Sequence, residues 1–385
     1  NSYTGEDTLE ISCHGSTFVQ QRILDVLSSS GIRMAQPGEF TLRAFLNGKL
    51  DLSQAEAVAD LIASDTATSH RIALSQLRGG FSDDIRALRQ ELVQFASLIE
   101  LELDFAEEDV EFASRKQLRD AVVNLQDRLH RLIRSFELGN VIKNGIPVVI
   151  AGKPNAGKST LLNSLLNEDR AIVSDIPGTT RDTVEEEVNL GGIRFRFIDT
   201  AGIRETTDTI ERIGVEKTME KIRQSPIILY LFDVNENSAG ELLKELEELR
   251  KHVDPSFILV PVGNKIDQYD TESLENEFKG IQDLLLISAK SGTNLDSLTS
   301  LLLRHTNAQK LQSGDTIITN ARHAEELRLT EMALQKVING IDRNATNDFL
   351  AGDLRFALFH LGTITGEISN DELLENIFSK FCIGK

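Results

Sequence analysis

The 385-residue chain has no tryptophan, only three methionines and only two cysteines. It also has no uninterrupted apolar run of the roughly 20 residues that a membrane-spanning helix needs, so we expect no membrane span. Cys13 and Cys382 are too few for a disulfide framework, and the seven histidines are scattered without the spacing of a zinc site. These absences indicate a cytoplasmic, reducing environment.

An excess of basic residues is also missing. The chain has 41 Lys and Arg against 60 Asp and Glu, a formal net charge of −19, and only acidic charges between Glu91 and Phe112. A solvated helix face is the simplest interpretation of that run. Phosphate contacts need Lys and Arg, so a nucleic acid would have to be gripped mainly through local patches or a basic partner.

The N-terminus lacks both an initiating methionine and a charged-then-apolar leader. Its first residues, "NSYTGEDTLEIS", resemble the interior of a domain. We therefore expect a preceding N-terminal segment, and we see no indication of secretion.

The chain changes character three times. Residues 1–48 are mixed: "TLEISCHGS" predicts a strand, and the next run predicts a helix that ends at Gly31. Residues 49–140 have helical periodicity. In their last helix the apolar stripe consists of Leu118, Val122, Leu125, Leu129, Leu132 and Phe136, and Gly139 is the predicted end.

Residues 141–305 alternate short apolar strands with helices, which predicts a mostly parallel, doubly wound sheet. The segment around Gly191 and Gly192 predicts an antiparallel hairpin at one edge. Residues 306–385 are again helical. Asn320 is predicted to cap a helix that stops at Gly340, and Ser369 with Glu372 predicts a capping box before a further helix. An α/β domain inserted into a helical one is the expected organisation.

The segment "GKPNAGKST" at 152–160 fits G-x-x-x-x-G-K-[ST] and lies between an apolar strand and a helical run. In that context the loop cradles phosphates at a helix N-terminus. Lys158 is predicted to reach the β- and γ-phosphates, and the Ser159 hydroxyl is predicted to bind Mg²⁺.

Three further motifs follow predicted strands in the order found in GTPases. Asp267 of "NKID" can accept two hydrogen bonds from guanine, whereas adenine offers no such donor pair. "SAK" at 288–290 and "DTAG" at 199–202 complete the set. The predicted nucleotide site consists of Asn155, Ala156, Gly157, Lys158, Ser159, Thr160, Ser174, Asp175, Ile176, Pro177, Gly178, Thr179, Thr180, Asp199, Thr200, Ala201, Gly202, Asn264, Lys265, Asp267, Ser288, Ala289 and Lys290.

Ile203 stands where Ras-like GTPases have the glutamine that orients the attacking water. Another residue, another cation or both must therefore assist hydrolysis. Arg181 lies in the segment between the phosphate loop and the hairpin and is kept as a candidate catalytic residue, although no spacing forces it into that role. The side-chain oxygen of Asn155 can hold a monovalent cation, and a loop-shaping hydrogen bond is the equal alternative.

The phosphate loop, "GTTRD", "DTAGIRETTDTIERIG", "AFLNGKLDLSQAEA" and the terminal "FCIGK" resemble the MnmE (TrmE) family of tRNA modification GTPases over the whole chain. The resemblance implies an N-terminal folate-binding and dimerisation domain, partial here, at 1–48. It implies a helical domain from 49–140 and 306–385, with a Ras-like GTPase domain at 141–305 between them.

The resemblance further implies a K⁺-dependent GTPase that dimerises through its GTPase domains and works as a homodimer. With an FAD-containing MnmG-type partner, in a heterotetramer, it modifies C5 of the wobble uridine of certain tRNAs to (carboxymethyl)aminomethyl-uridine. The one-carbon donor is 5,10-methylene- or 5-formyl-tetrahydrofolate.

Residue roles carry over only where the motifs match. By resemblance, Glu211 positions water and Cys382 faces the modification chemistry, beside Lys158 and Arg181 as catalytic candidates. The implied K⁺ ligands are Asn155, Ser174, Ile176 and Thr179, the implied Mg²⁺ ligands are Ser159 and Thr180, and the implied folate contacts are Glu10, Lys49 and Lys385.

Other readings stay open. An Era-like GTPase switch in ribosome assembly is one alternative, and a scaffold whose shape GTP controls is another. Era-like proteins usually carry a basic RNA-binding part, which this acidic chain lacks. A lipidation signal at Cys382 is disfavoured, because Gly384 and Lys385 fit it poorly. A cysteine without a chemical role remains the alternative for Cys382.

Overall fold

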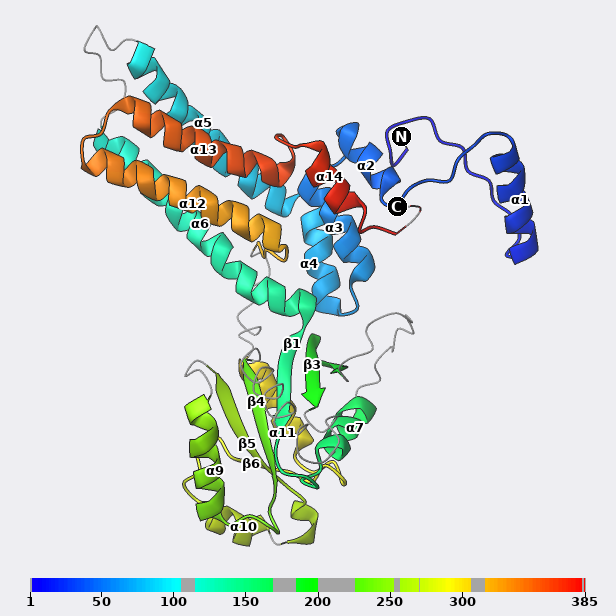
Figure 1. Cartoon of the computed structure of the whole chain (residues 1–385), viewed down its shortest axis with the longest axis vertical. Coiled ribbons are helices and arrows are strands. Elements are labelled where there is room, and N and C mark those ends of the chain that lie inside the picture. Colours follow the sequence, from blue (N-terminus) through cyan, green and yellow to red (C-terminus); the bar gives the residue numbers. More distant parts are fainter. Residues whose placement is uncertain are drawn as a thin grey trace, which may run out of the picture. The chain divides into compact units, whose positions relative to one another are not determined.

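The computed structural model describes residues 2–104, 115–168, 185–199, 226–252, 257–269, 271–305 and 316–382, together with Gly384. Its helices and strands are labelled in Figure 1. In chain order they are α1 Thr17–Ser29, α2 Glu39–Leu46, α3 Leu52–Ala63, α4 Ala67–Leu77, α5 Gly80–Asp104, α6 Arg115–Asn144, β1 Ile146–Ala151, α7 Lys158–Glu168, β2 Glu185–Leu190, β3 Ile193–Asp199, β4 Ile227–Asp233, α9 Ala239–His252, β5 Ile258–Asn264, the 3-10 helix η3 Ile266–Gln268, α10 Thr271–Glu277, β6 Leu285–Leu286, α11 Leu295–His305, α12 Ala321–Asp342, α13 Asn347–Thr365 and α14 Asp371–Phe378.

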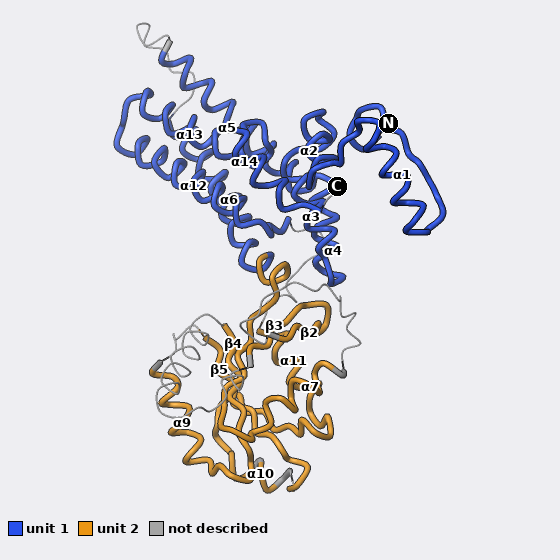
Figure 2. Tube along the Cα trace, turned by 45° about the vertical axis from the view of Figure 1, so that its right-hand side comes forward, with its two compact units in different colours: residues 1–139, 316–385 blue, residues 140–315 orange. Residues whose placement is uncertain are grey.

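The chain forms two compact units (Figure 2). Unit 1 consists of residues 1–139 and 316–385, and unit 2 consists of residues 140–315. Unit 1 therefore draws its residues from both sides of unit 2 in the sequence. Among the described helices, none is long and apolar enough to span a membrane.

Unit 1 is built mainly from long helices, of which α5, α6, α12 and α13 lie side by side (Figures 1 and 2). One apolar core joins residues from both chain segments, including Leu88 of α5, Leu334 of α12 and Leu354 of α13. The predicted stripe on α6 is confirmed, because Leu118, Val122, Leu125, Leu129 and Leu132 are all buried in this core and Phe136 packs against it. Burial of that stripe fixes which face of α6 points inward.

The predicted end of α6 at Gly139 is wrong, because the helix continues to Asn144. A Cβ atom at Gly139 would lie 1.9 Å from the backbone oxygen of Ile318. This glycine therefore allows two backbones to approach closely rather than ending the helix. The residue after the helix, Gly145, has a φ of 75°, a left-handed conformation typical of a helix terminus.

Two other helix boundaries differ from the predictions. The Asn320 cap is confirmed, since its side chain accepts a hydrogen bond from the Arg322 backbone, but α12 runs past Gly340 to Asp342. The predicted capping box of Ser369 is wrong. Helix α14 begins at Asp371, so the residue directly before it, Asn370, caps it by accepting from the backbone N–H of Leu373 at 2.8 Å.

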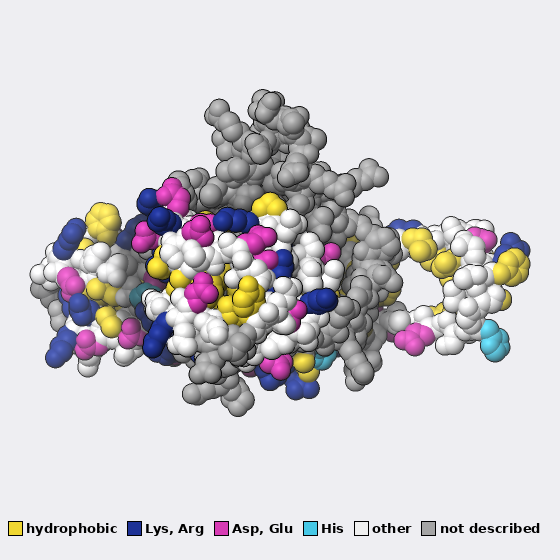
Figure 3. All heavy atoms as spheres, turned by 90° about the horizontal axis from the view of Figure 1, so that it is seen from below, with side chains coloured by type: hydrophobic (Ala, Val, Ile, Leu, Met, Phe, Trp, Pro, Cys, Tyr) yellow, Lys and Arg dark blue, Asp and Glu magenta, His cyan; other side chains and the backbone are white. Residues whose placement is uncertain are grey.

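The strand predicted at residues 8–16 is not formed: this segment is irregular in the structure. A strand needs a neighbouring backbone, and no pairing of this segment occurs among the described residues. Leu9 and Ile11 are exposed instead, and no residue of the following helix α1 is buried. The N-terminal segment with α1 lies at the right-hand side of Figure 3, where hydrophobic side chains are visible on its surface.

Unit 2 is a sheet of six described strands in the order β2-β3-β1-β4-β5-β6, with parallel pairing except between β2 and β3. The mostly parallel sheet and its antiparallel edge hairpin are therefore confirmed. Leucines of α7 and α11 share a core with Val148 and Leu229, while leucines of α9 and α10 share another with Phe232. Helices thus cover both faces, and the carboxyl ends of the parallel strands are left for loops.

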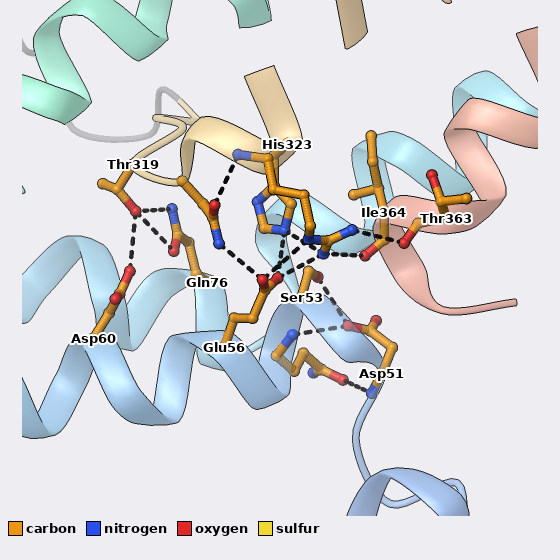
Figure 4. A network of polar contacts seen from close by, with 12 residues as sticks. Asp51, Ser53, Glu56, Asp60, Gln76, Thr319, His323, Thr363 and Ile364 are labelled. Carbon is orange, nitrogen blue, oxygen red and sulfur yellow. Dashed lines mark hydrogen bonds and ion pairs between the residues drawn. The ribbon is translucent and has the colours of Figure 1, made fainter. Parts of the chain in front are cut away.

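A buried carboxylate ties three helices of unit 1 together (Figure 4). Glu56 of α3 accepts a hydrogen bond from Arg322 Nη2 at 2.7 Å and contacts His323 Nε2 at 2.6 Å. Arg322 Nη1 also donates to the backbone oxygen of Thr363 near the end of α13. Burial alone would raise the pKa of Glu56, but His323 and Arg322 lower it to about 2. The carboxylate is therefore ionised and links α3 to α12 and α13.

Candidate nucleotide-binding site

The predicted phosphate loop joins the end of β1 to the start of α7. Three of its residues have positive φ: Gly152 at 143°, Asn155 at 63° and Gly157 at 97°. A Cβ at Gly152 would lie 2.0 Å from the Leu231 backbone oxygen, and one at Gly157 would lie 2.2 Å from Asn264 Nδ2. The two glycines are thus required both by backbone conformation and by close approach, which are the properties of a loop that wraps a phosphate.

Lys158 folds back over this loop. Its Nζ donates to the backbone oxygens of Gly152 at 2.7 Å and Lys153 at 2.9 Å, and the residue is only 8% exposed. Ser159 and Thr160 follow in the first turn of α7, where both are exposed. The loop therefore directs one ammonium group and the N-terminus of an 11-residue helix to the same place, a combination that favours an anion.

Asn264, at the end of β5, connects the predicted phosphate loop to the predicted base-contacting motifs. Its Nδ2 donates to the backbone oxygen of Ala156 at 2.8 Å, and its Oδ1 accepts from the backbone N–H of Ala289 at 2.9 Å. The residue is 3% exposed. Segments that are far apart in the sequence are thereby held together by one buried amide.

The two predicted base-contacting motifs meet beside this amide. The buried Ser288 hydroxyl donates to Asp267 Oδ1 at 2.6 Å, whereas Asp267 is an exposed residue. Ala289 is buried and Lys290 is exposed. A carboxylate oxygen has room for more than one donor, so Asp267 retains the capacity to accept from a ligand.

Lys265 of the same motif makes an ion pair that the sequence did not predict. Its Nζ lies 2.6 Å from Oδ2 of Asp233, at the end of β4. Burial would raise the pKa of Asp233, but hydrogen bonds from Lys265 and Asn235 lower it below its usual value. Lys265 also has a φ of 70°, a backbone conformation that non-glycine residues rarely adopt.

A second part of the predicted site lies outside the described residues: Ser174, Asp175, Ile176, Pro177, Gly178, Thr179, Thr180, Arg181, Thr200, Ala201, Gly202 and Glu211. Asp199 is the last residue of β3, and its backbone pairs in register with Ile150 of β1. It therefore lies at the carboxyl edge of the sheet, next to the strand that leads into the phosphate loop. Asn155 is exposed in that loop.

The predicted folate residues are partly described. Glu10 and Lys49 are exposed, and the Lys49 side chain runs close to Gly5, since a Cβ on Gly5 would lie 2.9 Å from Lys49 Cε. Lys385 lies outside the described residues. Among the described His, Cys, Asp and Glu residues, no group of three is arranged to bind a metal ion.

The C-terminal tail is anchored on α2. Phe378 and Phe381 are buried in a cluster with Leu52, and the Gly38 backbone N–H donates to the Cys382 backbone oxygen at 3.4 Å. A Cβ at Gly38, whose φ is 69°, would lie 2.6 Å from the Phe378 backbone oxygen. The side chain of Cys382 is therefore presented at the surface on a fixed backbone.

The comparisons with known proteins cover both units. A model described as the MnmE helical domain matches residues 52–382, and one described as the GTP-binding protein TrmE N-terminus matches residues 1–49. The chain is 56% identical over 384 residues to a protein of Cytophaga hutchinsonii named tRNA modification GTPase MnmE, covering 100% of this chain and 83% of that protein. A protein of the same name from Flavobacterium psychrophilum is 56% identical over 386 residues, covering 100% of this chain and 84% of that protein.

A solved structure of Aquifex aeolicus Era bound to GDP and AlF4⁻ is a weaker likeness, at 28% identity and a TM-score of 0.34, covering 49% of this chain and 66% of that chain. The family models and the curated relatives instead extend over nearly the whole sequence. The chain therefore belongs to the MnmE family, whose curated relatives named above are tRNA modification GTPases.

Proposed function

We propose that this GTPase drives the modification of C5 of the wobble uridine of certain tRNAs, together with an FAD-containing MnmG-type partner and a one-carbon tetrahydrofolate. The observation that carries the proposal is the combination of two features in one chain. Asn264 brings a phosphate loop against a guanine-reading motif, and the tail that bears Cys382 is packed on the N-terminal part of unit 1.

The proposed nucleotide site uses the described loops as follows. Lys158 leaves the backbone oxygens of Gly152 and Lys153 to bind the phosphates of GTP. Ser159, in the first turn of α7, is proposed to bind a Mg²⁺ ion that neutralises phosphate charge, with Thr180 as the second protein ligand. Asp267 accepts two hydrogen bonds from the guanine edge while Ser288 holds its carboxylate.

Hydrolysis in this proposal does not use a glutamine, because Ile203 occupies its place. Asn155 is in the phosphate loop with an exposed side chain, which suits a K⁺ ligand together with Ser174, Ile176 and Thr179. That cation would supply the positive charge that a finger arginine supplies in other GTPases. Glu211 is proposed to position the attacking water, and Arg181 is kept as a second candidate.

The modification chemistry is assigned to unit 1. Residues 1–48 are proposed as part of a folate-binding and dimerisation domain, and the segments 49–140 and 306–385 as a helical domain around an inserted GTPase domain. Lys49 and Lys385 suit the anionic glutamate tail of a folate, with Glu10 as a further contact. The anchored tail then keeps the Cys382 thiol beside the one-carbon unit.

The tRNA is proposed to be gripped mainly by the partner. The chain carries a net charge of −19, and on the face seen in Figure 3 basic and acidic side chains are interspersed. The described side chains on this face therefore form no broad positive field for a polyanion. The working assembly is proposed to be a homodimer joined to the MnmG-type protein in a heterotetramer.

The test uses a bacterial strain that lacks its own MnmE, supplied with this chain or its Lys158→Ala variant. Mass spectrometry of tRNA nucleosides should show C5-modified wobble uridine with the wild-type chain and little with the variant. Unmodified uridine with both chains, although both are expressed, would overturn the proposal. Restoration of ribosomal subunit assembly without restored modification would favour the Era-like alternative.

A further inference from the structure

The first side chain of the phosphate loop is tethered from outside the loop. Lys153, which occupies a variable position of the motif, places its Nζ 2.5 Å from Oε1 of Glu245 on α9. The side chains are 53% and 25% exposed, respectively. The hydrogen bond from Lys153 to Glu245 raises the pKa of Lys153 against the opposing effect of burial, so the ammonium is charged at neutral pH.

Glu245 is itself held in place by two donors. The Tyr230 hydroxyl of β4 donates to Glu245 Oε2 at 2.6 Å, and Asn237 Nδ2 donates to the same oxygen at 3.3 Å. Burial and the neighbouring carboxylate raise the pKa of Tyr230, so the phenol remains a donor. The anion that meets Lys153 is therefore fixed from a strand and from the turn that precedes α9.

The tether acts at the start of the loop, close to the residue that binds phosphate. Tyr230 lies opposite Ala151 in the register of β1 and β4, and Ala151 immediately precedes the loop. The backbone oxygen of Lys153 accepts from Lys158 Nζ at 2.9 Å and from the backbone N–H of Ala156 at 3.4 Å. The side chain of Lys153 is thus anchored to α9 while its backbone holds the interior of the loop.

We propose that Lys153 and Glu245 are positioning residues, whose ion pair keeps the phosphate loop in the conformation that accepts a nucleotide. The inference rests on the proposed assignment of residues 152–160 as the phosphate site. The pair shapes the loop before binding and does not meet the charge that develops during hydrolysis. It therefore favours GDP and GTP alike and leaves kcat unchanged.

The test is a mutant cycle on the full chain with Lys153→Met, Glu245→Gln, the double variant and Lys153→Arg. Dissociation constants for a fluorescent GDP analogue are measured beside kcat and KM for GTP. Each single variant should weaken GDP binding by about threefold to tenfold, as expected for a partly exposed pair with supporting hydrogen bonds. The double variant should be no weaker than either single variant, because the pair acts as one unit. Lys153→Arg should restore wild-type affinity.

The matched control is the pair of Lys251 and Glu248, which lies on the same helix at 2.8 Å and whose side chains are 68% and 63% exposed. Lys251→Met and Glu248→Gln should leave GDP affinity unchanged. Effects of Lys153→Met no larger than those of the controls, additive losses in the double variant, or a fall in kcat with unchanged affinity would each overturn the positioning role.

Lys158→Ala separates this inference from the site assignment on which it rests. If Lys158→Ala still binds GDP as the wild type does, the assignment of the phosphate site is wrong. If it loses GDP while the Lys153 and Glu245 variants bind normally, only the positioning role fails. Thermal unfolding of each variant shows whether it is folded, and Lys153→Gln replaces Lys153→Met if that variant is not.

Discussion

The hydroxyl of Ser288 donates a hydrogen bond of 2.6 Å to Oδ1 of Asp267. Ser288 is fully buried, so its hydroxyl has a fixed position, whereas the residue that carries the carboxylate is exposed. The bond orients Asp267 before any base arrives. A carboxylate held in this way can discriminate between bases by the donors that they present.

Asp267→Asn should therefore change the preferred base. An amide presents a donor to the guanine N1–H and 2-amino group, so GTP affinity should fall by at least about a hundredfold and xanthosine triphosphate should bind better than GTP. Competition binding with both nucleotides measures this. Asp296→Asn, in the first turn of α11, makes the same charge change away from the motif and should have no effect. Unchanged GTP affinity in Asp267→Asn would show that the base is read elsewhere.

Hydrolysis should be faster in K⁺ than in Na⁺ by about tenfold or more, since the proposal gives the charge of a finger arginine to a bound cation. Asn155→Gly keeps the positive φ of 63° and removes the side chain, so it should abolish this stimulation. Asn294 also has a φ of 63°, and Asn294→Gly should retain the stimulation. Equal rates in the two salts for the wild type, or stimulation that survives in Asn155→Gly, would contradict the cation assignment.

Glu56→Gln should destabilise unit 1 by about 3 kcal/mol at neutral pH, because it leaves the Arg322 guanidinium without its buried partner. The folded-state pKa of Glu56 is about 2, below the usual 4.5, so the carboxylate contributes stability above about pH 4.5 and loses it as the pH falls toward 2. The difference between wild type and variant should shrink over that range.

Urea unfolding followed by far-ultraviolet circular dichroism measures this difference. Glu325→Gln on α12, the helix that carries Arg322, is the control, since the pair of Glu325 and Arg328 is exposed and 3.7 Å long, and the change should cost little. A loss for Glu56→Gln that equals the control, or that stays constant down to about pH 2, would show that the buried carboxylate does not stabilise the unit.

Gly139→Ala should destabilise unit 1 by about 3 kcal/mol or more, because the added methyl group would collide with the Ile318 backbone. Gly352→Ala is its counterpart in α13, where nothing lies within 4 Å of the new Cβ. That change should stabilise the helix by about 0.5–1 kcal/mol. Thermal melts of the two variants should therefore move in opposite directions, and a stabilised Gly139→Ala would disprove the close approach.

The elements that were predictable from the sequence are those specified by local patterns. The apolar strands, the edge hairpin and the apolar stripe on α6 depend on residues near one another in the chain, and the structure confirms them. Helix ends were less predictable. Glycine is typical of a helix terminus, but Gly139 lies within α6 and allows the close approach of the Ile318 backbone. The local sequence pattern does not reveal this contact.

The parts of the site that escaped prediction depend on pairing across the fold. Glu245 is one of several acids in a polar helix, and only the position of α9 beside the loop brings it to Lys153. Asp233 ends a strand without any motif, and it meets Lys265 because their strands are neighbours in the sheet. The motif predicted which residues lie near the phosphates, but it carried no signal for residues outside it that contact the loop.

The most direct test of the central proposal compares two properties of Cys382→Ser. The thiol is exposed on a tail whose aromatic residues are packed against α2 and α3, so the substitution should leave the fold and the GTPase rate of the purified protein unchanged. In cells that depend on this variant, nucleoside analysis of tRNA should show that C5 modification of the wobble uridine is lost. Full modification with Cys382→Ser would contradict the account, because the tail would then have no part in the reaction that GTP hydrolysis is proposed to drive.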